Sequence, residues 1–166
     1  IDTVQLAIAD YTQAINLDPN SVEYLVNRAS AYAKIRNFQL ALQDFNKAAE
    51  MDPGYTFIYL NRSVVYHHLG QYQNEINDIN YYLSQDPYKS NMWANRGMAN
   101  MLLGNWNVVL NDLNQAIRLS PNSGILYFYR AQYHYNTNNI QQAQTDLNQA
   151  IQLGYRFSGS LDQLKI

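Results

Sequence analysis

The sequence contains no cysteine, little charge and no long apolar run. Without cysteine, a disulfide frame, a thiol nucleophile and a cysteine-bound metal are all excluded. Charged residues make up 14% of the 166 residues and the net charge is −2, which leaves no basic stripe for phosphates. No apolar run approaches the ~18–20 residues of a membrane-spanning helix. We therefore expect neither nucleic-acid binding nor membrane insertion, while the cellular compartment is left open.

The sequence also lacks the motifs that carry catalysis. It has no glycine-rich phosphate loop, no GxSxG turn and no HExxH pair. His67 and His68 are adjacent, so on a helix they point ~100° apart and do not hold one metal ion together. We expect no catalytic residue, no metal site, no cofactor and no enzymatic activity.

What the sequence does contain is a repeat with a period of ~34 residues. All four prolines keep this step, and so do a column of arginines and a column of aspartates. Such self-similarity is typical of stacked repeats, because one unit of this length cannot bury its apolar face alone. The prolines are Pro19, Pro53, Pro87 and Pro121; the arginines are Arg28, Arg62, Arg96 and Arg130; the aspartates are Asp44, Asp78, Asp112 and Asp146.

Within each repeat, apolar residues recur three and four positions apart, which indicates amphipathic helices separated by short breaks. A serine or threonine after each proline is expected to cap the first helix: Ser21, Thr56, Ser90 and Ser123. The pattern predicts an all-α protein. The expected helices are 21–36 and 38–51, 56–69 and 72–85, 89–103 and 106–119, and 123–137 and 140–153, preceded by 3–17.

The repeat resembles the tetratricopeptide repeat from residue 3 to about 154. Small residues share one first-helix column at Ala29, Ser63, Gly97 and Ala131, and alanines recur on the second helices. The resemblance implies a right-handed α-solenoid whose first helices line a concave groove, and a single domain over residues 1–166. Its expected parts are a second helix of a truncated repeat at 3–19, full repeats at 20–53, 54–87, 88–121 and 122–154, and a capping helix at 158–166.

Some residues depart from the family pattern. Glu75 and Tyr82 replace alanines, so we expect looser or reoriented packing in the repeat that holds them. Gly154-Tyr155 replaces Asp-Pro, which predicts that the repeats end there. Helix 3–17 lacks its partner and leaves an apolar edge.

The first candidate binding group is the asparagine column Asn27, Asn61 and Asn95, which Tyr129 interrupts in the last repeat. The resemblance places this column in the groove. A side-chain amide carries both a donor and an acceptor, so it can pair with the backbone of an extended peptide whatever its side chains are. The alternative is that asparagine is merely tolerated there on an exposed helix face.

The second candidate is an apolar floor in the same groove. It would comprise Val64, Met98, Phe128 and Tyr135. By the family geometry the groove would also show Val26, Leu60, His67, Ala94, Met101 and Gln132. The alternative is that curvature of the solenoid buries some of these side chains against neighbouring helices. The scarcity of charge predicts weak salt dependence of binding.

Two further features have structural interpretations. The chaperone-binding adaptors of the family clamp a carboxylate with two cations, but Phe57 and Asn61 stand at those positions, so no such clamp is expected. Each arginine of the repeat could pair with the aspartate of its own repeat or with that of the preceding one, as Arg62 could with Asp78 or Asp44. In both cases the pair would fix helix register.

Taken together, the residues predict a non-enzymatic protein-interaction scaffold that binds a protein or peptide ligand, either an extended peptide or a helix. The rival interpretations are self-association through the open edge at 3–17, and a recruiting arm of a larger enzyme.

Overall fold

The computed structural model describes residues 3–166, and over this range the fold is all-α, as predicted. Each helix begins and ends within two residues of the range expected from the sequence. Between them, these residues form the α-helices α1 (Thr3–Leu17), α2 (Val22–Lys34), α3 (Phe38–Met51), α4 (Thr56–His68), α5 (Tyr72–Gln85), α6 (Ser90–Leu102), α7 (Trp106–Leu119), α8 (Gly124–Asn136) and α9 (Ile140–Gln152), and one 3-10 turn, η1 (Leu161–Leu164).

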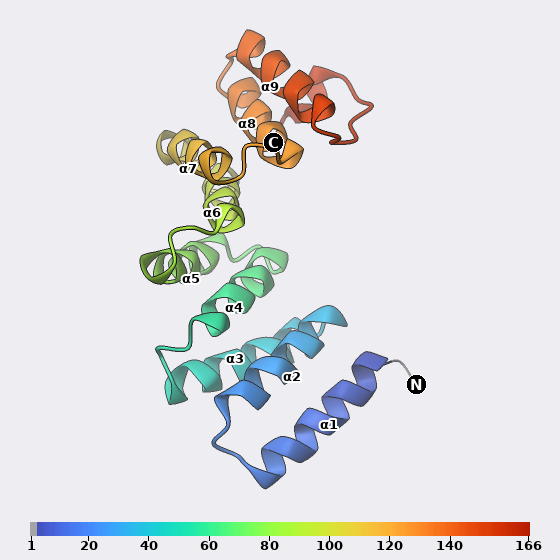
Figure 1. The fold of residues 1–166 in the computed structure, drawn as a ribbon, viewed down its shortest axis with the longest axis vertical. Helices are drawn as coiled ribbons and strands as arrows, with labels where there is room; N and C mark the ends of the chain where they lie inside the picture. The colour runs from blue at the N-terminus through green and yellow to red at the C-terminus, as the bar shows by residue number, and fades with distance from the viewer. Residues whose placement is uncertain (1–2) are drawn as a thin grey trace. The chain divides into compact units, whose positions relative to one another are not determined.

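The chain divides into two compact units, and the first, Ile1–Gln85, holds α1 to α5. Each helix of this unit packs against the next along the chain, and the first helices α2 and α4 also touch (Figure 1). Its core is centred on Leu25, Phe45 and Ile58, which are all fully buried. The α2–α4 contact is what places two first helices side by side.

The second unit, Asp86–Ile166, holds α6 to α9 and η1. Here α6 and α8 touch, and η1 packs on α8. The segment expected to form a capping helix over 158–166 contains only the single 3-10 turn, whose Leu164 is fully buried beside Ala143 and Leu147. That the two units together act as one repeat domain stays a prediction.

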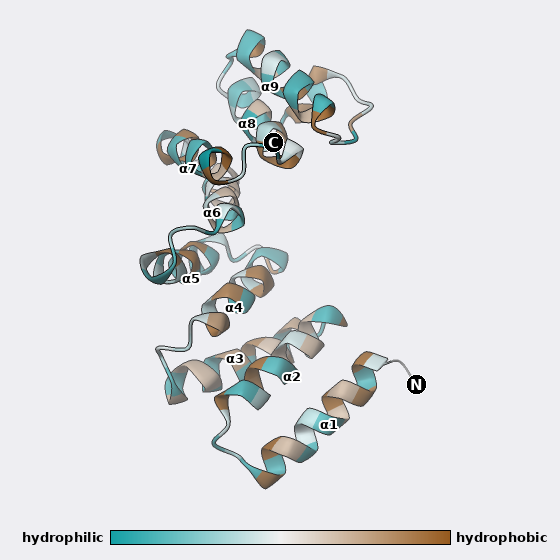
Figure 2. Ribbon diagram, in the orientation of Figure 1, coloured by the Kyte–Doolittle hydropathy of each residue, from teal (hydrophilic) through white to brown (hydrophobic). Residues whose placement is uncertain are grey.

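The helices form because each has an apolar stripe that meets its neighbours, so hydrophobic and hydrophilic residues alternate around the ribbons in Figure 2. Of the expected caps, Ser21 accepts a hydrogen bond from the backbone N–H of Tyr24 at 3.3 Å. The expected caps Thr56 and Ser90 are wrong, because they are the first helical residues and the N-cap positions belong to Tyr55 and Lys89. No helix among residues 3–166 is both long and apolar enough to cross a membrane.

The two departures from the alanine columns are accommodated inside the first unit. Tyr82 is buried, and Glu75 is only 2% exposed. The Glu75 carboxylate lies 3.0 Å from Nδ1 of His67 on α4, so its buried charge has a partner. With this pairing, α4 and α5 still pack as a helix pair.

Candidate functional site

The first unit contains a pocket of about 470 Å³ between α2 and α4, which we call the α2–α4 pocket. Helix α2, the turn after it, the start of α3 and the helix α4 all contribute to its wall. Phe45 and Val65 form a buried floor. Its volume falls in the range of ordinary ligand sites. The pocket is lined by Ser30, Ala33, Lys34, Arg36, Phe38, Phe45, Asn61, Val64, Val65 and His68.

Two residues of the predicted site, Asn61 and Val64, lie together on this pocket. Val64 is 45% exposed, which is unusual for a valine. The Asn61 amide nitrogen donates to the Phe57 carbonyl at 2.7 Å, and its oxygen remains available as an acceptor. Asn27 lies on α2, half-buried, and does not line the pocket.

The remaining predicted residues lie in the second unit, where they are half-buried. Met98 and Tyr129 pack against the core around Met101 and Val109, and burial raises the pKa of Tyr129. Phe128 and Tyr135 pack against the cluster that contains Leu164, as do Phe157 and Leu161. Asn95 lies on α6. The structure therefore packs Phe128 and Tyr135 against one cluster, to which the C-terminal segment contributes Leu164.

Three of the wider groove positions are not on a binding surface. Val26, Ala94 and Met101 are buried, at 4% exposure or less. Val26 and Ala94 each belong to a hydrophobic core cluster, and Met101 packs with Val109 and Leu113. For these residues the alternative interpretation, burial against neighbouring helices, is the one that holds.

The C-terminal segment is held by an amide on a first helix. The Asn136 side-chain nitrogen donates to the Leu164 carbonyl at 2.9 Å, and its oxygen accepts from the Ile166 backbone N–H at 3.1 Å. Both ends of one amide thus pair with the backbone of a single peptide segment. This is the type of contact that the sequence predicted for the asparagine column, made here by a different asparagine.

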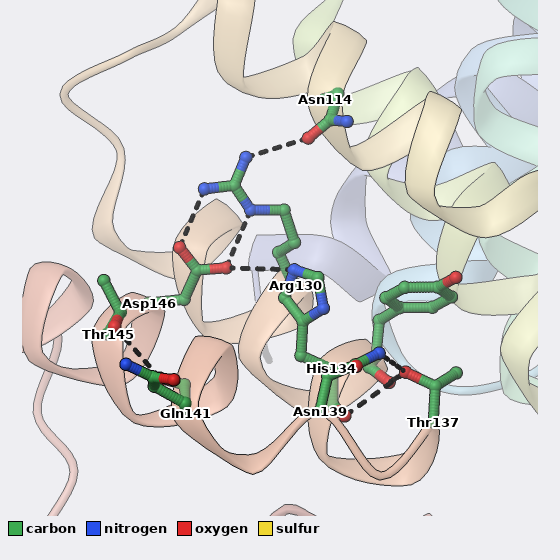
Figure 3. A network of polar contacts seen from close by, with 9 residues as sticks. Asn114, Arg130, His134, Thr137, Asn139, Gln141, Thr145 and Asp146 are labelled. Atoms are coloured by element: carbon green, nitrogen blue, oxygen red, sulfur yellow. Dashed lines mark hydrogen bonds and ion pairs between the residues drawn. The ribbon is translucent and has the colours of Figure 1, made fainter.

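The arginine column pairs with the aspartate of the same repeat in all four repeats, which decides between the two alternatives. Each pair is bidentate, with N–O distances between 2.7 and 2.9 Å. Arg130 also donates to Asn114 of the preceding second helix at 2.8 Å (Figure 3). Arg62 reaches Asn46 in the same way at 2.9 Å. Because each guanidinium is engaged inside the protein, this column holds helices together rather than serving a ligand.

The histidines serve in packing and pairing. The ring of His68 stacks on Phe38 with 5.2 Å between centroids, and so forms part of the pocket wall. The hydrogen bond with Glu75 raises the pKa of His67. Burial lowers the pKa of His134, whose Nε2 lies 3.7 Å from Asp146 (Figure 3). Residues 3–166 contain no group of three or more acidic or histidine side chains placed to hold a metal ion.

Sequence reasoning missed most of the pocket wall, including Lys34, Arg36 and Phe38. One signal in the sequence could have indicated Arg36. It occupies the helix–helix turn column that is otherwise held by Gly70, Gly104 and Asn138, which are residues suited to a positive φ. A long cation at such a position is a local exception to the repeat.

Helix–turn–helix units recurring along the chain define an α-helical repeat protein. Residues 4–56 match the sequence profile of the tetratricopeptide repeat family. The chain has a tetratricopeptide-type helical repeat fold, and this fold typically serves protein interaction. No curated protein matches it in sequence.

Solved structures agree on the fold. MamA (residues 41 to the end) from Desulfovibrio magneticus RS-1 superposes with a TM-score of 0.88 at 14% identity, covering 91% of this chain and 85% of that one. MamA from MSR-1 gives 0.82 at 17% identity, covering 90% and 86%. YrrB, described as a TPR protein with an unusual peptide-binding site, gives 0.76 at 18% identity, covering 87% and 74%. At these identities, the superpositions establish a shared fold and nothing beyond it.

Proposed function

We propose that this chain is a non-enzymatic interaction module that binds a protein or peptide segment on its first helices, anchored at the α2–α4 pocket. The observation that carries the proposal is the pocket itself, which joins Asn61 and Val64 on one apolar hollow. An apolar pocket with a few convergent polar groups is the ordinary form of a binding site. The description of YrrB as having a peptide-binding site lends support by analogy of fold.

The proposed role of the asparagines is to pair with the ligand backbone. Asn136 supports it, because its amide already pairs with a carbonyl and an N–H of a segment of this same chain. Asn61 would use its free oxygen to accept from a ligand N–H at the pocket. Asn27 in the first unit and Asn95 in the second are proposed as further backbone contacts. Met98, Phe128, Tyr129 and Tyr135 are half-buried, and the parts of these side chains that stay exposed would contribute apolar contacts in the second unit.

A phage-displayed library of random dodecapeptides, selected on the wild-type protein, would supply a ligand. Fluorescence anisotropy would then give the affinity of one enriched peptide for variants shown by circular dichroism to be folded. Val64→Asp is expected to weaken binding at least about tenfold, because it places a charge on the apolar pocket. Asn61→Ala is expected to cost about fivefold, the value of one hydrogen bond.

The matched control is Val108→Asp, since Val108 on the second helix α7 is 41% exposed, close to the 45% of Val64. It should leave the affinity unchanged. Loss of binding in Val108→Asp but not in Val64→Asp would move the site to the second helices and overturn the proposal. Failure of the library to enrich any peptide on the wild type would overturn it as well.

The rival, self-association through α1, is favoured by the 48% exposure of Leu6 on that helix. Mass in solution as a function of concentration tests it directly. A mass that rises with concentration in the wild type, and not in Leu6→Gln, would support association through this edge. A constant monomer mass would exclude it.

A further inference from the structure

The rim of the α2–α4 pocket is cationic. Lys34 and Arg36 both line the pocket and are exposed, and His68 lies across from them on α4. None of the residues that line the pocket is acidic. Among the described residues, no ion pair involves either Lys34 or Arg36. In a protein whose net charge is −2, the pocket therefore carries an uncompensated local positive charge.

Arg36 holds its charge at a position where arginine is conformationally unfavourable. Its φ is 60°, which lies in the left-handed region. This conformation is unfavourable in free energy for an L-residue with a long side chain. The equivalent turns use Gly70 and Gly104, with φ of 69° and 77°, and Asn138, with φ of 63°. Glycine and asparagine tolerate this conformation, so the turn itself does not need arginine. The turn thus carries a cation although its backbone conformation disfavours arginine.

The floor beneath these cations is apolar and aromatic. Phe38 stacks on His68, and Phe45 is fully buried beside Val65. Val64 completes the apolar surface at the opening. A bulky apolar side chain thus finds apolar walls inside, while a group beside it on the same peptide meets Lys34 and Arg36 at the rim.

We propose that the α2–α4 pocket selects peptides that carry a bulky apolar residue with an aspartate or glutamate within two positions of it. The apolar side chain fills the pocket, and the carboxylate pairs with Lys34 and Arg36. This inference rests on the proposed function and specifies its ligand. Charge-assisted hydrogen bonds to a carboxylate are stronger than neutral ones, and arginine offers them in bidentate form. Binding at this pocket then depends on salt, unlike the weak salt dependence expected from composition alone.

The test is to run the same dodecapeptide selection on the wild type and on the double variant Lys34→Gln/Arg36→Gly. On the wild type, enriched peptides should share an apolar residue with a neighbouring acid. On the double variant, the apolar residue should remain and the acid should disappear from the consensus. For one enriched peptide, exchange of its acid for the amide should weaken wild-type binding about fivefold, and should not change binding to the double variant.

Two outcomes would overturn this inference and leave the proposed function standing. Enrichment of apolar peptides with no acidic preference would overturn the inference and leave the proposed function standing. An acidic preference that persists in the double variant would also overturn it, because other groups would then bind the carboxylate. If the wild type enriches nothing, both fail together.

Arg36→Gly alone provides a second measurement that a purely structural role would not reproduce. This variant should raise the melting temperature, because glycine adopts the positive φ of the turn without strain. It should also weaken binding of the acidic peptide, because it removes the cation. Asn138→Gly changes the equivalent turn of the last repeat without changing charge and should leave binding unaltered. If Arg36→Gly lowered the melting temperature, or left acidic-peptide binding intact, the proposed role of Arg36 as a strained cation that binds the ligand carboxylate would be wrong.

Discussion

The surface between α2 and α4 in the first unit is hollowed into a pocket, whereas Phe128 and Tyr135 on α8 in the second unit lie against the chain's own C-terminal segment. Yet both surfaces are formed by first helices of the same kind of repeat. In the first unit, Val65 packs in one cluster with Phe45; in the second, Leu164 packs in one cluster with Leu147. The equivalent second-helix residues Phe45 and Leu147 are thus packed by a helix in the first unit and by a short segment in the second.

First-helix residues that the family geometry places in one groove therefore have different surroundings in the two units. Val64 is available because α4 leaves it at the edge of a pocket. Phe128 stacks on Tyr155 and lies against Phe157, and Tyr135 packs on the cluster that contains Leu164, so both are half-buried. The exposure of a first-helix residue thus depends on the segment that packs next to it as well as on its column.

The largest effect is expected from breaking the cover of the second unit. Leu164→Ala removes a fully buried side chain and should lower the free energy of unfolding of this region by about 3 kcal/mol. Hydrogen exchange should accelerate in α8 and α9 and remain unchanged in residues 3–85. Leu17→Ala is the control, since Leu17 is 88% exposed. Equal exchange in the wild type and Leu164→Ala would contradict the packing role of the segment.

An intermediate effect is expected from the amide that holds the segment. Asn136→Ala removes the hydrogen bonds to Leu164 and Ile166 and should destabilise the docked segment by about 1–2 kcal/mol. The amide proton of Ile166, measured by NMR, should lose its protection from exchange. Asn136→Asp keeps an acceptor for that N–H and should retain part of the protection. Protection that survives in Asn136→Ala would show that the amide does not hold the segment.

The sequence predicted the helices well because the apolar period and the proline step determine them locally. It left the partner of each arginine undecided, since spacing alone fits two aspartates, and only packing selects the one in the same repeat. Ser21 was identified correctly as a cap, but Thr56 was not, because the preceding Tyr55 has the extended backbone of an N-cap without a capping side chain.

The candidate binding surface is harder to predict than the fold. Asn61 and Val64 lie on the pocket, whereas Val26 on α2 is buried in the core cluster with Leu25 and Phe45. Lys34 and Arg36 escape an analysis of the repeat, because their place on the pocket arises only where the end of α2 meets α4 in space. A repeat pattern describes what the repeats have in common, whereas this pocket is lined partly by residues such as Arg36 that the other repeats lack.

The smallest effect, and the one that compares the units most directly, is the pH dependence of two histidines. The pKa of His67 is raised by its hydrogen bond with Glu75, so the folded state binds the proton more tightly. Its contribution is complete below the unfolded pKa of about 6.5 and is lost as the pH rises through the folded value. The pKa of His134 is lowered, chiefly by burial and despite Asp146. Its effect has the opposite sign, because protonation in the unfolded state removes stability as the pH falls below about 6.5.

Local hydrogen exchange of the wild type, His67→Gln and His134→Gln at several pH values between 5 and 9 separates the two signs, once intrinsic exchange rates are subtracted. Relative to the wild type, His67→Gln should be least stable in α4 and α5 at low pH, and the difference should shrink as the pH rises. His134→Gln should gain stability in α8 and α9 at low pH relative to the wild type, and that gain should vanish near pH 8. His67 is partly exposed, so its effect should also decrease with added salt, whereas that of the more buried His134 should not. Differences of the same sign in both units would mean that one of the two ring environments is assigned wrongly.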